Sequence, residues 1–190
     1  MLGKVIFTNW RTEDLTEKAK YFSVFQNGLD FGFASDPAAP TRCHYDRANN
    51  TPYLLNAKYC FGFTNDLLAA EVKNMAGSEV VTCDSSEPKS IAELRQYGVT
   101  AAAAIKGKDS VNFGIQWLQK LQIVIDYRLK EAINEFTVYK WREDKDGNVL
   151  PEPVDKNNHI IDSARYALEH EMSWMGNRFD SANIPIAGVS

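Results

Sequence analysis

The chain has 190 residues, 44% of them hydrophobic and 24% charged, and its formal net charge is −4. This composition is typical of one globular domain with a sizeable core, and no apolar run approaches the roughly 20 residues that a membrane-spanning helix needs. The beginning of the chain lacks a signal-peptide pattern, so we expect a soluble protein of the cell interior that is not secreted. The acidic balance gives no sign of a nucleic-acid partner, because proteins that hold DNA alone usually carry a basic surplus.

The first part of the chain predicts strands and turns. Residues 1–20 are polar and are interpreted as a lead-in or linker, whereas 21–33 is rich in aromatic and β-branched residues, which favours a strand. Two further strands are expected over 41–46 and 53–59, joined by the turn-rich run 46–51 as a hairpin loop.

Helices alternate with strands in the middle of the chain. Cap residues, apolar spacing of three and four, and terminal glycines indicate the helices, and short apolar runs indicate the strands. In chain order we expect a helix over 64–77, a strand over 79–83, a helix over 88–98, a strand over 99–105, a helix over 109–118, a strand over 121–126 and a helix over 127–135.

The last part of the chain predicts a hairpin and one more helix. Residues 136–141 and 149–150 flank the tight-turn signal Asp146-Gly147, which indicates a hairpin standing off the main sheet. This hairpin could gate access to a site or be a passive surface loop. The final helix is expected over about 158–168.

The order of these elements indicates the fold class. Strands first, and then strands alternating with helices, give an α/β domain with a mixed central sheet flanked by helices. Three antiparallel strands followed by β-α-β units is the order of the RNase H-like fold. We therefore expect one RNase H-like domain over 21–172, between the lead-in 1–20 and a C-terminal tail 173–190, with an extra hairpin before the last helix.

The three cysteines, Cys43, Cys60 and Cys83, lie far apart in the sequence, with no CxxC pair. An odd and scattered set argues against a disulfide framework and against a zinc site. We interpret them as small core residues, since free cysteine behaves as a buried hydrophobe.

Acidic residues fall at two predicted strand ends and on the last predicted helix. Asp30 and Asp84 end strands, and ligand sites of open α/β sheets gather at the carboxyl ends of strands. Asp162 follows His159 by three positions, so both lie on one helix face. Each acid alone also has a plain structural explanation: a turn for Asp30, a helix cap for Asp84, and a favourable charge in the first helical turn for Asp162.

Together these carboxylates can converge on a hard divalent cation, which prefers oxygen ligands. Sites of this kind hold two metals roughly 4 Å apart that clamp the attacking and leaving oxygens of a phosphodiester. The metals also offset the repulsion between an acidic pocket and a phosphate backbone, which would allow an acidic protein to cut DNA.

Several short motifs follow one another along the chain: residues 28–33 (GLDFGF) with 35–39 (SDPAA), then 84–91 (DSSEPKSI), then 106–110 (KGKDS), and finally 139–141 (YKW) with 158–168 (NHIIDSARYAL). They resemble, in this order, the first nuclease motif, the second, the run after it and the closing motif of the nuclease domain of the large terminase subunit of tailed phages, of the SPP1-like and PBSX-type family. The resemblance covers about residues 20–170, with the motifs in the family's order and spacing.

The resemblance implies an endonuclease that cuts concatemeric double-stranded viral DNA during genome packaging, with Mg²⁺ or Mn²⁺ as cofactor and two ions in the site. On this reading Asp30, Asp84 and Asp162 are the catalytic, metal-binding acids, and His159 is a further ligand or a group behind the ligands. A lone histidine near a helix start is otherwise usually structural. Two more acids, Asp36 and Glu87, are candidates for the layer behind the metal ligands.

Several basic residues are candidates for contacts with DNA phosphates, although charged residues of this kind usually form merely solvated faces. The candidates are Lys89, Lys106 and Lys108, with Arg95, Arg128 and Lys130 as further members of such a rim.

The family also carries an ATPase motor, and nothing in this sequence reads as one. The run 106–110 superficially resembles a Walker motif, but Ala102 stands where its first glycine is needed and Asp109 replaces the Ser or Thr. The resemblance therefore implies a nuclease domain apart from its motor. Its partners would be double-stranded DNA, the motor domain, the small terminase subunit and the portal, in the cytoplasm of the host cell.

Two other readings stay open. Another enzyme of the same fold, such as a resolvase or transposase core, would use the same carboxylate chemistry on branched DNA. A docking module without catalysis would instead bind portal or packaging proteins.

Overall fold

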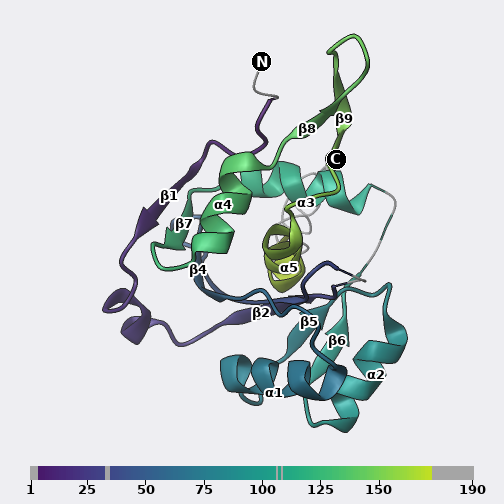
Figure 1. The fold of residues 1–190 in the computed structure, drawn as a ribbon. Coiled ribbons are helices and arrows are strands. Elements are labelled where there is room, and N and C mark those ends of the chain that lie inside the picture. The colour runs from purple at the N-terminus through teal and green to yellow at the C-terminus, as the bar shows by residue number, and fades with distance from the viewer. Residues whose placement is uncertain (1–3, 33–34, 106, 108, 173–190) are drawn as a thin grey trace, which may run out of the picture.

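A seven-stranded sheet forms the centre of the molecule (Figure 1), and the computed structural model describes residues 4–32, 35–105, 107 and 109–172. The strand order is β1-β7-β4-β3-β2-β5-β6. β2 pairs antiparallel with β3 and β3 with β4, whereas the other neighbours are parallel. The strands are β1 (Trp10–Glu13), β2 (Gln26–Asp30), β3 (Ala39–Asp46), β4 (Thr51–Ala57), β5 (Val81–Cys83), β6 (Ala101–Ala103) and β7 (Ile123–Asp126).

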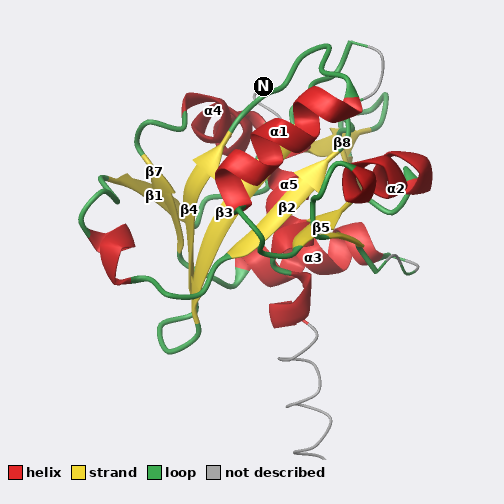
Figure 2. Ribbon diagram, turned by 90° about the horizontal axis from the view of Figure 1, so that it is seen from below, coloured by secondary structure: helices red, strands yellow, loops and turns green. Residues whose placement is uncertain are grey.

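Helices cover both faces of the sheet, as Figures 1 and 2 show. One core joins the sheet to α3, α4 and α5, and a second core joins its other face to α1 and α2. A short 3₁₀ helix, Lys18–Tyr21, follows β1. The α-helices are α1 (Asn65–Ala76), α2 (Pro88–Gln96), α3 (Ser110–Gln119), α4 (Lys130–Val138) and α5 (His159–Ala167).

A separate two-stranded hairpin of β8 (Trp141–Glu143) and β9 (Val149–Pro153) stands off the main sheet between α4 and α5 (Figure 1). The extra hairpin expected before the last helix is thus present. Its first strand begins later than expected, because α4 continues to Val138, where Glu135 and Phe136 lie on its buried face.

Helix α5 lies very close to β2, and Gly28 makes this approach possible. A Cβ added at Gly28 would lie 1.9 Å from the backbone oxygen of Ser163 and 3.0 Å from the backbone nitrogen of Ala167. Gly28 and Asp30 are two residues apart on β2 and therefore share one face of the strand. The close packing thus brings the end of β2 next to the face of α5 that carries the candidate site.

The lead-in expected over residues 1–20 was wrong for the part that the structure describes. Trp10–Glu13 forms the edge strand β1, and Ile6, Phe7 and Leu15 are buried. The segment looks polar because β1 is an edge strand whose two middle side chains, Arg11 and Thr12, are exposed. A few apolar residues around it suffice to join it to the core.

Other expectations differ only in their bounds. The strand expected over 21–33 shortens to Gln26–Asp30, because Tyr21 belongs to the 3₁₀ helix. The helix expected from 127 begins at Lys130, since the Asp126 carboxylate accepts hydrogen bonds from the backbone and side chain of Arg128 and forms a turn there. All three cysteines are buried and free, as expected. None of the helices within the described residues is long and apolar enough to span a membrane.

Candidate metal centre

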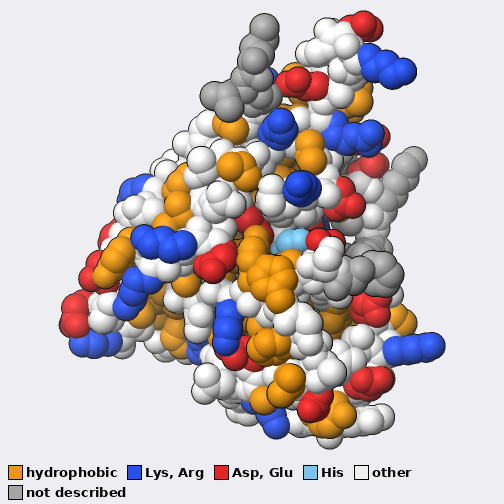
Figure 3. Space-filling view, viewed as in Figure 1, with side chains coloured by type: hydrophobic (Ala, Val, Ile, Leu, Met, Phe, Trp, Pro, Cys, Tyr) orange, Lys and Arg blue, Asp and Glu red, His pale blue; other side chains and the backbone are white. Residues whose placement is uncertain are grey.

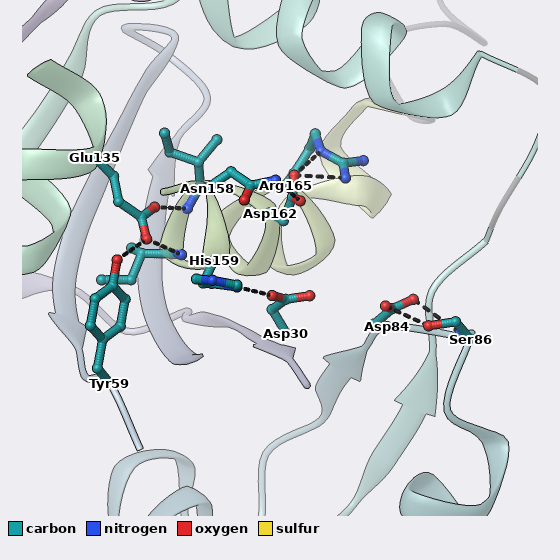
Figure 4. A network of polar contacts seen from close by, with 11 residues as sticks. Asp30, Tyr59, Asp84, Ser86, Glu135, Asn158, His159, Asp162 and Arg165 are labelled. Carbon is teal, nitrogen blue, oxygen red and sulfur yellow. Dashed lines mark hydrogen bonds and ion pairs between the residues drawn. The ribbon is translucent and has the colours of Figure 1, made fainter. Parts of the chain in front are cut away.

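The centre of the candidate site is a contact between the end of β2 and the start of α5 (Figure 4). Asp30 is the last residue of β2, and its Oδ2 lies 3.0 Å from Nδ1 of His159, the first residue of α5. Both side chains are largely buried, at 11% and 18% exposed. The hydrogen bond to Asp30 raises the pKa of His159, and the charges of Glu135 and Asp36 act in the same direction.

Asp162 lies one turn further along α5 and is held from two sides. Its Oδ1 accepts hydrogen bonds from Arg165 Nε at 3.2 Å and Nη2 at 3.0 Å. Its Oδ2 accepts a hydrogen bond from Asn158 Nδ2 at 3.0 Å. Burial raises the pKa of Asp162, and the charge of Arg165 opposes that shift.

Asp84 follows β5, the strand next to β2 in the sheet, and its backbone N–H donates to the carbonyl oxygen of Leu29. Its carboxylate accepts two hydrogen bonds from Ser86, from the backbone N–H at 3.0 Å and from the hydroxyl at 2.7 Å. In Figure 4 it lies across from the pair of Asp30 and His159. The turn that follows β5 thus presents this acid at the same end of the sheet as Asp30.

The three acids are close enough to act on one another electrostatically. Burial raises the pKa of Asp30 to about 6, and the negative charges of Asp162 and Asp84 contribute to that rise, against the hydrogen bond from His159. The same three carboxylates, together with burial, raise the pKa of Tyr166 on α5. A shared neighbour of this kind shows that β2, β5 and α5 place their acids around one region.

The donors in this region suit a hard divalent cation. Carboxylate oxygens with one imidazole are the ligand types that Mg²⁺ and Mn²⁺ accept. Burial raises the pKa of Asp30, and the neighbouring acids add to that rise, so a bound cation would favour its ionised form. Within the described residues, no three Asp, Glu, His or Cys side chains stand close enough together to enclose an ion as they lie. The residues therefore fit a metal by their chemistry, while Asp84 is turned to Ser86 and Asp162 to Arg165.

The start of α5 is fixed by a buried acid that the sequence analysis did not single out. Glu135 of α4 has no exposed surface, and its two carboxylate oxygens accept the backbone N–H groups of Ile160 at 3.0 Å and Ile161 at 2.9 Å. The hydroxyl of Tyr59 also donates to Glu135, and the Tyr59 ring stands edge-on to His159, with centroids 6.1 Å apart. Burial raises the pKa of Glu135, against these hydrogen bonds.

Two of the missed residues left a signal in the sequence. Glu135 occupies a position on the apolar stripe of its helix, with Ala132, Phe136 and Tyr139 at helical spacing, and all four are buried. An acid at such a position must find partners inside the fold. Arg165 follows Asp162 by three residues, a spacing that permits an ion pair on one helix face.

The other predicted site residues lie elsewhere or outside the description. Asp36 is exposed and reaches His159 only through its charge. Glu87 precedes α2 and accepts a long hydrogen bond from the Ser90 hydroxyl at 3.5 Å, which ties it to its own helix. Lys89 is exposed on α2, and Lys106 and Lys108 lie outside the described residues.

The basic rim expected around the site is not gathered into one patch on the face shown in Figure 3, where Lys and Arg are scattered among acidic and hydrophobic side chains. Arg95 donates to the backbone of Ala101, and Arg128 is paired with Asp126 at the end of β7. Lys130 donates to the carbonyl of Tyr127. These three cations are thus engaged locally.

Asp162 also faces open space. It lines a cavity of about 310 Å³ with Arg165, Tyr166 and residues of α3, and a second one of about 370 Å³ toward the base of the hairpin at Pro153 and Val154. Both cavities include Gly107 and Ser110 at the start of α3. The candidate centre is therefore open to solvent on the side of α3 and the hairpin.

Known proteins resemble this chain in sequence and in fold. Residues 30–170 match the family described as Terminase RNAseH like domain. The chain is 38% identical over 181 residues to the large terminase subunit of Bacillus phage SPP1. The aligned region covers 90% of this chain and 42% of that protein. It is 28% identical over 151 residues to the PBSX phage terminase large subunit of Bacillus subtilis strain 168, with 77% of this chain and 34% of that protein covered. The chain thus spans less than half the length of these two relatives.

Solved structures show the same fold. The crystal structure of the nuclease domain of the SPP1 large terminase, with bound manganese, matches with a TM-score of 0.82 and 36% identity over 88% of this chain and 99% of that chain. A large terminase nuclease from a thermophilic phage, with bound magnesium, has a TM-score of 0.58 at 16% identity, over 77% of this chain and 80% of that chain, and supports the fold alone. The molecule is an RNase H-like domain of the terminase nuclease type. The chain belongs to the terminase RNase H-like domain family, which confirms the resemblance seen in the sequence.

Proposed function

We propose that the chain is a divalent-metal-dependent endonuclease that cuts concatemeric double-stranded viral DNA during genome packaging. The observation that carries this proposal is that two neighbouring strands and one helix bring Asp30, Asp84 and Asp162 within electrostatic reach of one another, with His159 hydrogen-bonded to Asp30. The manganese-bound nuclease domain of the SPP1 terminase, similar over most of this chain, supports it.

Asp30, Asp84 and Asp162 would hold Mg²⁺ or Mn²⁺, with His159 as a further ligand or as the partner that orients Asp30. We infer two ions, because a pair of ions can stabilise both the attacking and the leaving oxygen of a phosphodiester, and water would complete their coordination beside the protein ligands. When bound, the ions supply charge neutralisation at the phosphodiester and activation of the attacking water. The protein itself orients the acids: His159 hydrogen-bonds to Asp30, and Asn158 and Arg165 hold Asp162.

The packaging role rests on the relatives, of which this chain covers less than half. In that setting an ATPase motor domain, the small terminase subunit and the portal would be its partners, in the cytoplasm of the host cell. These partners would also bring DNA to a domain with a formal net charge of −4.

Cleavage of supercoiled plasmid tests the proposal. We expect nicking and linearisation with Mn²⁺ or Mg²⁺, and none with EDTA. Asp84→Asn should abolish cleavage, because it removes one negative ligand while leaving a side chain that can still accept hydrogen bonds from Ser86. Asp146→Asn, an exposed acid in the hairpin turn, is the matched control and should cut normally.

The two alternatives have distinct outcomes in the same assay. Strong preference for branched over linear duplex would indicate a resolvase-type enzyme of the same fold. Failure of the folded protein to cut DNA, combined with failure to bind Mn²⁺ in a calorimetric titration, would contradict the nuclease proposal and favour a docking module.

A further inference from the structure

The side chain of Asn158, the residue at the N-cap position of helix α5, makes no capping hydrogen bond to that helix. Asn158 stands at the N-cap position, and asparagine there usually accepts a hydrogen bond from the second or third N–H group of the helix. Its side chain makes no such hydrogen bond and instead donates to Asp162 Oδ2, one turn along the helix. The two N–H groups in question belong to Ile160 and Ile161, and both are bound to Glu135.

Glu135 is therefore a cap supplied by another helix. A carboxylate suits this place, because the start of a helix carries partial positive charge and N–H groups without partners in the helix. The Tyr59 hydroxyl completes the set of donors around Glu135, which is fully buried between α4 and α5. Asn158 is itself only 8% exposed, so its side chain depends on partners within the protein.

We propose that Glu135 is a positioning residue of the metal centre, which caps α5 in place of Asn158 and thereby leaves Asn158 to orient Asp162. The inference rests on the proposed function, because it is Asp162's role as a metal ligand that gives its orientation a consequence. Without the Glu135 carboxylate, the side-chain oxygen of Asn158 stands at the N-cap position, from which it can accept the N–H group of Ile160 or Ile161. It would turn back onto its own helix, and Asp162 would lose its hydrogen bond from Asn158 while keeping those from Arg165.

A first experiment needs no metal. In Glu135→Gln the amide oxygen can accept one of the two N–H groups, but its NH₂ group faces the other as a second donor. Nuclear magnetic resonance should then show a shifted side-chain amide signal for Asn158 and faster exchange of the Ile160 and Ile161 amide protons. Glu131→Gln, at an exposed position of the same helix, is the matched control and should leave these signals unchanged. An unchanged Asn158 signal in Glu135→Gln would overturn the inference.

A second experiment measures Mn²⁺ affinity by calorimetry on the folded variants. We expect Glu135→Gln to weaken binding by roughly 10- to 100-fold, as changes behind metal ligands commonly do, and Glu131→Gln to leave it unchanged. Asn158→Ala should weaken binding too, and adding Glu135→Gln to Asn158→Ala should cause no further loss, because the side chain that would turn is already gone. If Glu135 only stabilised the fold, Glu135→Gln would weaken Mn²⁺ binding by the same factor in the wild type and in Asn158→Ala. That result would overturn the proposal.

The two proposals can fail separately. If Asp84→Asn abolishes cleavage while Glu135→Gln binds Mn²⁺ and cuts DNA like the wild type, the site is real and Glu135 does not position it. If the wild type neither binds Mn²⁺ nor cuts DNA, the nuclease proposal fails, and the resonance experiment still decides whether Glu135 releases Asn158 from capping.

Discussion

Gly114 of α3 and Arg165 of α5 are in such close contact that a Cβ added at Gly114 would lie 2.4 Å from Arg165 Cδ and 2.7 Å from its Cγ. Arg165 is 7% exposed and donates hydrogen bonds to Asp162, and α3 packs against the aliphatic part of its side chain. Because Gly114 has no side chain, Arg165 can pack against α3 while it donates hydrogen bonds to Asp162, a candidate metal ligand on α5.

Replacing this glycine should disturb both stability and the site. We expect Gly114→Ala to lower the free energy of unfolding by up to about 2 kcal/mol, since overpacking typically costs about 1–3 kcal/mol and better helix propensity returns roughly 1 kcal/mol. Urea denaturation measures this change, and Mn²⁺ titration should show weaker binding. Gln116→Ala, at an exposed position of α3, is the control. Equal stability and affinity of Gly114→Ala and the wild type would show that Arg165 can move aside without loss.

A side chain added at the contact between β2 and α5 should destabilise the protein more than one added at Gly114. In Gly28→Ala the new methyl would meet the backbone oxygen of Ser163 at 1.9 Å, and backbone cannot move aside as a side chain can. We expect a loss of at least about 3 kcal/mol, at the upper end of overpacking effects, seen as a lower thermal unfolding midpoint by circular dichroism. Gly107→Ala, where a Cβ meets no atom within 4 Å, should be nearly neutral. A Gly28→Ala protein as stable as Gly107→Ala would contradict the close packing of α5 on β2.

The stability of the metal-free protein should depend on pH through Asp30. Its pKa is raised from 3.8 to about 6 in the folded state, so folding favours the protonated acid. The resulting stabilisation is fully present below about pH 4 and is lost as the pH rises through about 6, an effect of roughly 2–3 kcal/mol. Denaturation in EDTA from pH 4 to pH 7 should show the wild type losing stability relative to Asp30→Asn. A constant difference between the two proteins across this range would contradict the raised pKa.

Divalent metal should offset the loss of stability that ionised Asp30 causes near neutral pH. Mn²⁺ binds ionised carboxylates, so we expect it to raise the thermal unfolding midpoint more at pH 7.5 than at pH 5. A free concentration of 100 times the dissociation constant corresponds to about 2.7 kcal/mol. Differential scanning fluorimetry measures the shift, with Ca²⁺ as a comparison for ions of another size. Asp84→Asn should lose most of the Mn²⁺ effect, and a shift that survives in this variant would place the ion elsewhere.

Much of the candidate site could be predicted from local patterns. Asp30 and Asp84 were recognised because each lies at the end of a predicted strand, and the topology of the sheet makes those strands neighbours. Asp162 and His159 were recognised by their spacing on the last helix. Patterns of this kind depend on residues close in the sequence, which is why the sequence alone could indicate them.

The remaining parts depend on contacts between distant residues. Glu135 binds N–H groups 25 and 26 residues further along, and Gly114 meets Arg165 across two helices. Nothing in the local sequence around Glu135 indicates which helix start it caps. The edge strand β1 was missed for a related reason, because its pairing with β7 joins Trp10 to Ile123 while two of its four side chains face solvent.

The segment that carries β1 also ties two parts of the molecule together mechanically. β1 runs parallel to β7 over four residue pairs, from Trp10 with Ile123 to Glu13 with Asp126. Just before it, Ile6 donates to the carbonyl of Tyr139, and Trp141, the first residue of β8, donates to that of Lys4. Tension along this segment would load the hydrogen bonds of β1 together, in shear, and would pull on the base of the hairpin at the same time. A force on this end of the fold would therefore be transmitted to the rim of the cavity that Asp162 lines.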